Sequence, residues 1–287
     1  MRDRGANLMM PARGPVPSSG SRQEAAAGWP RPRNDSVRRA LLTAVNIGGF
    51  FLLWEWLVRQ SGVSPIFLPP PSTIFKAAAE MIGRGQLWGH LSYSAANFAI
   101  GFALSAVAGT VLGLLMGASR SVESILGPYV WALYATPRIA LLPLLILWFG
   151  FGAESKILLI FLSAVMPILI TSMDGVKTVD QALLRAARVF GATRTQIYTR
   201  VVLPFTLPFI MTGLRQGVGR GLIAMVVAEM FGSGRGVGFM IARSAAQLDT
   251  ATTFALLLVL VVLSVGLVYM MTALERRVAP WREDVRV

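Results

Sequence analysis

Long stretches without charged residues constrain this chain more than any other feature. Several of them approach the roughly 20 apolar residues that an α-helix needs to cross the hydrocarbon core of a bilayer. The composition agrees, since 54% of the 287 residues are hydrophobic and 14% are charged, whereas a soluble domain has about 25% charged residues. The sequence therefore predicts an all-α, polytopic membrane protein.

Six apolar segments are long enough to count as membrane spans. They are about 40–58, 94–117, 125–149, 155–173, 204–231 and 253–274. Pro137 and Pro143 interrupt the third segment, and proline kinks or breaks a helix. Backbone groups freed at membrane depth persist only beside protein or water. We therefore expect the break to belong to a solute pathway.

Small residues recur every four positions in the second predicted span. The stripe consists of Gly101, Ser105, Gly109 and Gly113. Residues at this spacing share one side of a helix and allow close approach of a neighbouring helix. A helix-packing face is the favoured interpretation, and a wall facing water is the alternative.

The end of the first span and the loop after it carry two local signals. Glu55 lies among apolar residues and needs an interfacial position or a partner. Residues 69–71 are three consecutive prolines, which impose an extended backbone. A short amphipathic helix is expected after them, near residues 73–82.

The formal net charge is +13, a value that could indicate nucleic acid. The basic residues, however, flank the spans and concentrate on the segments that share one side with the N-terminus. This distribution follows the positive-inside rule and indicates no nucleic-acid partner. It predicts that both termini are cytoplasmic, with a disordered basic tail at 1–39, a transmembrane domain at 40–275 and a C-terminal tail at 276–287.

The longest polar segment between spans, residues 174–203, has a helix–turn–helix pattern. The two expected helices are 179–190 and 193–202. Gly191 ends the first helix, and Pro204 is tolerated in the first turn of the next span. Small Ala186 and Ala187 are expected on one side of the first helix, with arginines on the other. The segment is either a docking surface for a partner or a connector held by anionic lipid.

This segment resembles the cytoplasmic signature of the permease subunits of bacterial ATP-binding-cassette importers. That signature reads Glu-Ala-Ala, three residues, Gly, nine residues, then Ile-x-Leu-Pro. The matching residues here are Arg185, Ala186, Ala187, Gly191, Val201, Leu203 and Pro204. The spacing is kept, while Arg185 replaces the Glu and Val201 replaces the Ile. Residues 136–157 and 213–241 and the sequence FLPPPSTIF are similar to the nitrate, sulfonate, taurine and bicarbonate branch.

The resemblance implies a type I importer permease fold in the bacterial inner membrane, with cytoplasmic coupling helices. The implied partners are two ATP-binding-cassette ATPase subunits, a second permease copy, an extracytoplasmic solute-binding protein and the lipid bilayer. The implied substrate is a small anionic solute of the sulfonate, taurine, nitrate or bicarbonate class, and a small heterocyclic vitamin precursor is the alternative. The implied coupling segment, residues 177–204, includes Arg185, Ala186, Ala187, Gly191, Ala192, Val201, Leu203 and Pro204.

Catalysis by this chain is not expected. The sequence has no G-x-x-x-x-G-K-[ST] phosphate loop, and GSGRGVG at 232–238 lacks the Lys-Ser/Thr pair. It has no cysteine and one histidine, His90, for which a role at a loop edge is favoured over metal binding. We expect no cofactor or metal on this chain, with ATP and Mg²⁺ held by the partner ATPase. The alternative function is a secondary transporter or channel without an ATPase, although such transporters often carry intramembrane carboxylates.

Four charged residues fall inside the predicted spans: Arg138, Arg215, Arg220 and Glu229. An arginine at the bilayer centre costs about 2.5–3.5 kcal/mol on insertion scales, so these side chains face protein or water. With Pro137 they are candidates for the translocation path. The alternative is structural, with the arginines pairing with Glu229 or with helix-end carbonyls. Arg215 and Arg220 are separated by about 140° around a helix, so both cannot face one narrow pore.

Overall fold

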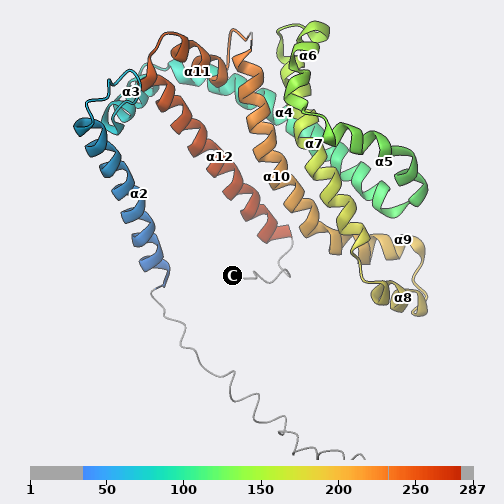
Figure 1. Cartoon of the computed structure of the whole chain (residues 1–287). Helices are drawn as coiled ribbons and strands as arrows, with labels where there is room; N and C mark the ends of the chain where they lie inside the picture. Colours follow the sequence, from blue (N-terminus) through green and yellow to red (C-terminus); the bar gives the residue numbers. More distant parts are fainter. Residues whose placement is uncertain (1–34, 232, 279–287) are drawn as a thin grey trace, which may run out of the picture. The chain divides into compact units, whose positions relative to one another are not determined.

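The computed structural model describes residues 35–231 and 233–278, and every regular element in those residues is helical (Figure 1). The α-helices are α2 (Asp35–Gln60), α3 (Pro71–Gly83), α4 (Gln86–Ala118), α5 (Arg120–Ala135), α6 (Leu142–Phe149), α7 (Ala153–Lys177), α8 (Gln181–Val189), α9 (Arg194–Ile197), α10 (Leu203–Met230), α11 (Val237–Ala246) and α12 (Thr250–Val278). A 3₁₀ turn, η1 (Arg138–Leu141), precedes α6, and a π-helical turn, η2 (Tyr198–Val202), precedes α10. The predicted all-α class is confirmed.

The chain divides into two compact units, residues 1–53 and 54–287. In the described residues the first unit holds only the beginning of α2. The second unit holds the end of α2 and all the other helices, and the contacts given below lie within it. The predicted tails at 1–39 and 276–287 fall largely outside the described residues.

Five helical segments are long and apolar enough to cross a membrane, and a sixth is broken. The five are 41–60, 86–118, 153–177, 194–230 and 250–278. Helices α5 and α6 with η1 form the sixth, which bends by 89°. The break falls at Thr136 and Pro137, as predicted. Pro143 does not break a helix, because it lies in the first turn of α6, where a missing N–H is tolerated.

The broken pair α5–α6 reaches both ends of α7. At one end, the Glu123 carboxylate in the first turn of α5 is 2.5 Å from the Lys177 ammonium at the end of α7. At the other end, α6 leads through a short turn at residues 150–152 into the start of α7. Figure 1 shows α6 and α8 at opposite ends of α7. A re-entrant loop would return to its starting side, so this placement favours one broken span. The structure thus holds five to six candidate spans, in agreement with the predicted number of about six.

A three-helix bundle (α4, α7 and α10) forms the centre of residues 54–287, with α7 between the other two. The small residues of α4 lie directly against α7. A Cβ atom at Gly101 would stand 2.8 Å from the Ile157 carbonyl oxygen, and one at Gly113 would stand 2.5 Å from the Leu169 carbonyl oxygen. Contacts this short leave no room for a side chain. The stripe is therefore a packing face, which confirms the favoured interpretation.

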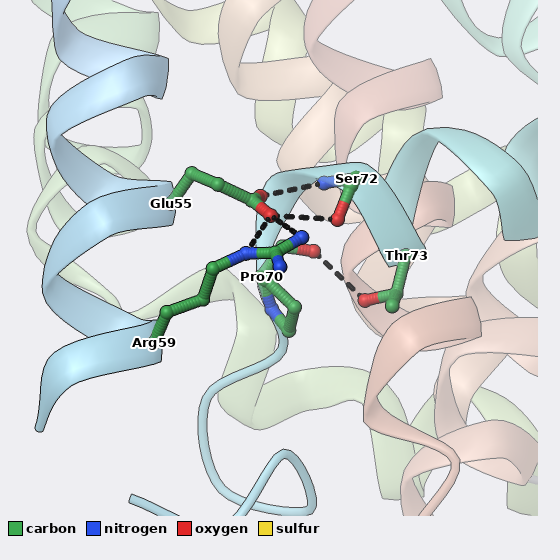
Figure 2. Close-up of polar contacts among 5 residues, drawn as sticks. All are labelled: Glu55, Arg59, Pro70, Ser72 and Thr73. Atoms are coloured by element: carbon green, nitrogen blue, oxygen red, sulfur yellow. Dashed lines mark hydrogen bonds and ion pairs between the residues drawn. The ribbon is translucent and has the colours of Figure 1, made fainter. Parts of the chain in front are cut away.

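Glu55 finds its partners at the start of α3, as Figure 2 shows. Its carboxylate accepts hydrogen bonds from the Ser72 backbone N–H at 3.0 Å and from the Ser72 hydroxyl at 2.8 Å. Arg59, one turn further along α2, donates to the same carboxylate from Nε at 2.7 Å. A carboxylate at a helix N-terminus satisfies free N–H groups and the helix dipole. The acidic residue among apolar neighbours thus anchors the short helix that follows the three prolines.

Candidate functional site

Helix α8, in the predicted coupling segment, is delimited by its own sequence. The Asp180 side chain accepts a hydrogen bond from the Ala182 N–H at 2.7 Å, which caps the start of the helix. Gly191 follows the end of the helix with φ of +76°, a left-handed conformation that favours glycine. Its N–H donates to the Arg188 carbonyl at 2.9 Å. The predicted glycine stop is confirmed.

Helix α9 is a single turn that a capping box holds in place. The Thr193 N–H donates to the Gln196 side chain at 2.8 Å, and the Gln196 N–H donates to the Thr193 hydroxyl at 3.3 Å. This reciprocal pair satisfies two of the N–H groups that a helix start leaves free. The turn between α8 and α9 therefore has a defined shape on both sides.

The second short helix and the fifth span are joined, although the sequence predicted a boundary at Pro204. Residues Arg194–Met230 form one helical run of 37 residues. The π-helical turn η2 ends immediately before Leu203 and Pro204. Proline has no N–H, and its ring obstructs the carbonyl four residues earlier. The wider π turn coincides with this position, so the helix continues where a break was expected.

The inward side of α8 covers a small apolar cluster. Buried Val179, Ile197 and Val202 form it, and Leu184, Ala187 and Ala192 pack against them. The expectation that Ala186 and Ala187 share one side of α8 is wrong, because Ala187 is half-buried in this cluster whereas Ala186 is exposed. Successive residues of an α-helix point about 100° apart.

The outward side of α8 ends in an apolar tip that sequence reasoning missed. Val189 is 85% exposed and Phe190 is 89% exposed. Arg185 and Ala186 are exposed on the same short helix. The available signal was two large apolar residues directly before a glycine stop in a polar segment. Two adjacent exposed apolar side chains in a polar segment form a candidate contact surface for a partner.

A groove of about 750 Å³ lies beside the tip, between α8–α9 and the ends of α4 and α7. Arg188 and Arg194 line it, and neither has an ion pair with the described residues. The Tyr198 hydroxyl at its edge donates to the Ala118 carbonyl at 3.3 Å. The remaining coupling residues lie at the start of α10, where Val201 and Pro204 are half-buried and Leu203 is exposed.

The arginines of the predicted path separate into two groups. Arg215 reaches α12, where its Nη1 is 3.3 Å from a carboxylate oxygen of Glu275. Arg138 and Arg220 instead line one cavity of about 290 Å³, together with Pro137. The prediction that Arg215 and Arg220 cannot face one pore agrees with this separation.

Arg138 is held in place at the break between α5 and α6. Its Nη2 donates to the Tyr134 carbonyl at 3.1 Å, and its guanidinium carbon lies 5.7 Å from the centre of the Tyr134 ring. Its Nη1 lies 3.5 Å from the Ser163 carbonyl of α7. Arg220, on α10, is exposed and has no hydrogen bond or ion pair to any residue that the structure describes. The residues of the described chain that line this cavity include no carboxylate.

Glu229 lies apart from all three arginines and is fully buried. Its carboxylate accepts hydrogen bonds from the Ser94 hydroxyl of α4 and from the Gly238 N–H, both at 2.9 Å. The Ser94 oxygen accepts a further bond from the Val237 N–H at 2.9 Å. His90 lies within α4 and accepts a hydrogen bond from the Gly236 N–H at its Nδ1. These contacts fix the first turn of α11 against α4 and α10.

Comparison with protein families gives a match to the binding-protein-dependent transport system inner membrane component over residues 109–280. The chain belongs to this family. It is accordingly the permease subunit of an importer, an integral multi-pass protein of the inner membrane, and a transport component rather than an enzyme.

Two relatives confirm the expected branch of the family. The taurine transport system permease protein TauC of Escherichia coli (strain K12) is 34% identical over 254 residues, covering 87% of this chain and 92% of that protein. The putative aliphatic sulfonates transport permease protein SsuC of Bacillus subtilis (strain 168) is 36% identical over 273 residues, covering 91% and 98%. The formylaminopyrimidine transport permease protein ThiX of Halalkalibacterium halodurans is 33% identical, covering 82% and 94%.

A solved structure supports the fold. The crystal structure of an amino acid ABC transporter with histidines matches with a TM-score of 0.54, covering 71% of this chain and 98% of that one. Its sequence is 15% identical. The expected importer permease fold is thus confirmed at the level of the fold.

Proposed function

We propose that this permease works as a pair of identical subunits, driven by two ATP-binding-cassette ATPase subunits that dock on the coupling segment 177–204. An extracytoplasmic binding protein delivers the solute to the opposite face. The solute is a small anion of the sulfonate, taurine, nitrate or bicarbonate class. ATP and Mg²⁺ are bound by the ATPase, and this chain holds no cofactor.

The exposed tip of α8 is the observation that carries the proposal. Val189 and Phe190 remain uncovered while the opposite side of α8 is packed against its own apolar cluster. A segment whose inner side is anchored and whose outer side is apolar has the form of a helix that enters a groove on another protein. The caps at Asp180 and Thr193 and the turn at Gly191 hold this exposed surface in one shape, which supports the docking role.

Charge supports a cytoplasmic position for the α8–α9 end and for both termini. This end carries five basic residues on the coupling segment and two more at the end of α12: Lys177, Arg185, Arg188, Arg194, Arg200, Arg276 and Arg277. The opposite end carries Arg59, Lys76, Arg84, Lys156, Arg235 and Arg243, and the first end also carries Arg120. Excess basic residues mark the cytoplasmic side of a membrane protein.

The cavity lined by Arg138 and Arg220 supports the proposal that a second copy of the permease packs against this one. Its location in two predicted spans places both guanidinium groups within the apolar segments, where contact with lipid is unfavourable. A second subunit across from this face would enclose a water-filled path and keep the arginines away from lipid. The substrate class is proposed from the relatives, whose names specify taurine and aliphatic sulfonates.

Co-purification tests the docking role directly. Phe190→Ser should remove the larger of the two exposed side chains of the apolar tip without touching a packed residue, so we expect at least a tenfold loss of the ATPase subunit recovered with the tagged permease. The matched control is Phe67→Ser, which removes a phenylalanine that is 78% exposed in the loop before α3. Membrane levels of both variants should equal those of the native chain.

Two results would overturn the proposal. One is equal recovery of the ATPase with Phe190→Ser and with the native chain. The other is solute uptake by vesicles that contain the purified permease alone, since that result would establish a transporter or channel that needs no ATPase.

A further inference from the structure

We propose that Arg138 and Arg220 form an anion-selective binding site within the membrane, which takes the oxyanion headgroup of a small organic anion such as a sulfonate. This inference deepens the proposed function and rests on it. Arg215 is not part of this site, because it forms an ion pair with Glu275.

The composition of the cavity is the first argument. Two guanidinium groups face about 290 Å³ of space, and the lining residues that the structure describes contain no acidic side chain. The other lining residues are Thr136, Pro137, Ile139, Ser163 and Ile223. Charges within apolar surroundings are normally paired, and here the counter-charge is missing from the described chain. A bound anion would supply it.

The contrast with Arg215 is the second argument. Arg215 lies on the same helix, α10, and has a carboxylate partner in Glu275. Arg220, about 140° further around that helix, has no partner among the described residues. One helix therefore carries a neutralised arginine on one side and an uncompensated one on the cavity side. Only the second is available to an entering anion.

The position of Arg138 is the third argument. It is the first residue of η1, directly after the break between α5 and α6. Its contacts with Tyr134 and the Ser163 carbonyl fix its orientation before a ligand arrives. Arg220 is about 15 Å from the end of α10, given a rise of 1.5 Å per residue. The pair therefore lies deep within the spans and away from both ends.

The size and chemistry of the cavity indicate the ligand. Pockets for drug-sized molecules occupy about 300–1,000 Å³, so this cavity suits a smaller solute. Guanidinium groups match the geometry of planar and tetrahedral oxyanions, and the Ser163 residue also lines this cavity. Ile139 and Ile223 offer apolar contact to a short carbon chain. Sulfonate or carboxylate headgroups on small organic anions fit this combination.

Cysteine labelling tests the site without knowledge of the natural solute. The chain has no cysteine, so Ile223→Cys introduces a single thiol into the cavity wall. The probes are sulfonatoethyl methanethiosulfonate, an anion, and trimethylammonioethyl methanethiosulfonate, a cation. They are applied to membranes containing the full importer, and modification of this chain is followed by intact-mass spectrometry. The anion-to-cation rate ratio is divided by the same ratio for free mercaptoethanol.

We expect the normalised ratio to exceed unity by about tenfold or more, because a basic cavity concentrates anions. Adding Arg138→Gln and Arg220→Gln should bring the ratio within about twofold of the free thiol. Arg215→Gln is the matched control and should leave it unchanged. Replacing both cavity arginines with lysine should preserve most of the preference for the anionic reagent. This variant shows whether the loss of preference in the glutamine variants comes from the missing charge or from misfolding. If the double glutamine variant fails to accumulate in membranes, Arg220→Gln alone provides the comparison.

Three outcomes would overturn the inference: a native ratio equal to that of the free thiol, a preference that survives removal of both charges, or no modification by either reagent. ATPase co-purification from the same membranes separates this inference from the proposed function. Retained ATPase without anion preference refutes the site alone. Anion preference without any bound ATPase refutes the importer assembly while the site stands.

Discussion

The three-helix bundle and the coupling segment are stabilised in opposite ways. In the bundle, glycines let α4 and α7 approach until a Cβ atom would collide with backbone oxygens. The coupling segment has one small apolar cluster, and its helices are bounded by side-chain caps. The bundle depends on contacts between residues far apart in the chain, and the segment depends mainly on near neighbours. A surface that meets a partner can thus stay exposed without losing its shape.

The largest expected effect comes from filling the bundle's closest contact. Gly113→Leu places a side chain against the Leu169 carbonyl and the Ser172 side chain. Overpacking against backbone should cost about 3 kcal/mol or more and lower the midpoint of thermal unfolding by about 10 °C. Gly89→Leu, also on α4, is the control, since no atom of a neighbouring residue lies within 4 Å of the position that its Cβ would take. Equal unfolding temperatures for the two variants would contradict the packing face.

A second variant tests whether the coupling segment can lose its structure while the three-helix bundle keeps its own. Gly191→Pro is incompatible with φ of +76° and removes the N–H that bonds to Arg188. We expect residues 180–200 to lose protection in hydrogen–deuterium exchange, while protection in α7 stays unchanged. Transport-coupled ATPase activity should fall at least tenfold. Gly191→Asn is the control, because asparagine tolerates the left-handed region. Loss of protection throughout α7 would show that the two regions are not independent.

The smallest expected effect comes from the cap of α9. Thr193→Ala removes one half of the capping box and should cost about 1 kcal/mol locally. Hydrogen–deuterium exchange at residues 194–197 should rise by about fivefold, which corresponds to that free energy. Thr195→Ala is the control, since that side chain is exposed and caps nothing. If both variants exchange alike, the capping box does not set the stability of this turn.

The same contrast explains what the sequence predicts and what it does not. Apolar length, the glycine stripe, the break at Pro137 and the stop at Gly191 are local signals, and all four agree with the structure. The error at Ala186 and Ala187 came from treating neighbours on a helix as one face. The continuity through Pro204 depends on a π turn, for which the segment carries no local signal.

The charged residues show more clearly which contacts cannot be predicted from the sequence. Pairing of Arg215 with Glu275 and of Glu229 with Ser94 joins residues 60 and 135 positions apart. Which arginine is neutralised depends on where α12 and α11 pack. Sequence reasoning could nominate Arg138, Arg215, Arg220 and Glu229 together. Only their placement in the fold separates the two that share a cavity from the two that do not.

The continuous helix from Arg194 to Met230 has a mechanical consequence. At 1.5 Å per residue it is a rod about 55 Å long, and it carries α9 at one end and Arg220 along its length. A tilt of about 5° applied at the α9 end would displace the far end by about 5 Å over that length. The tilt of this one helix would therefore couple the proposed docking at one membrane face to the width of the cavity beside Arg220.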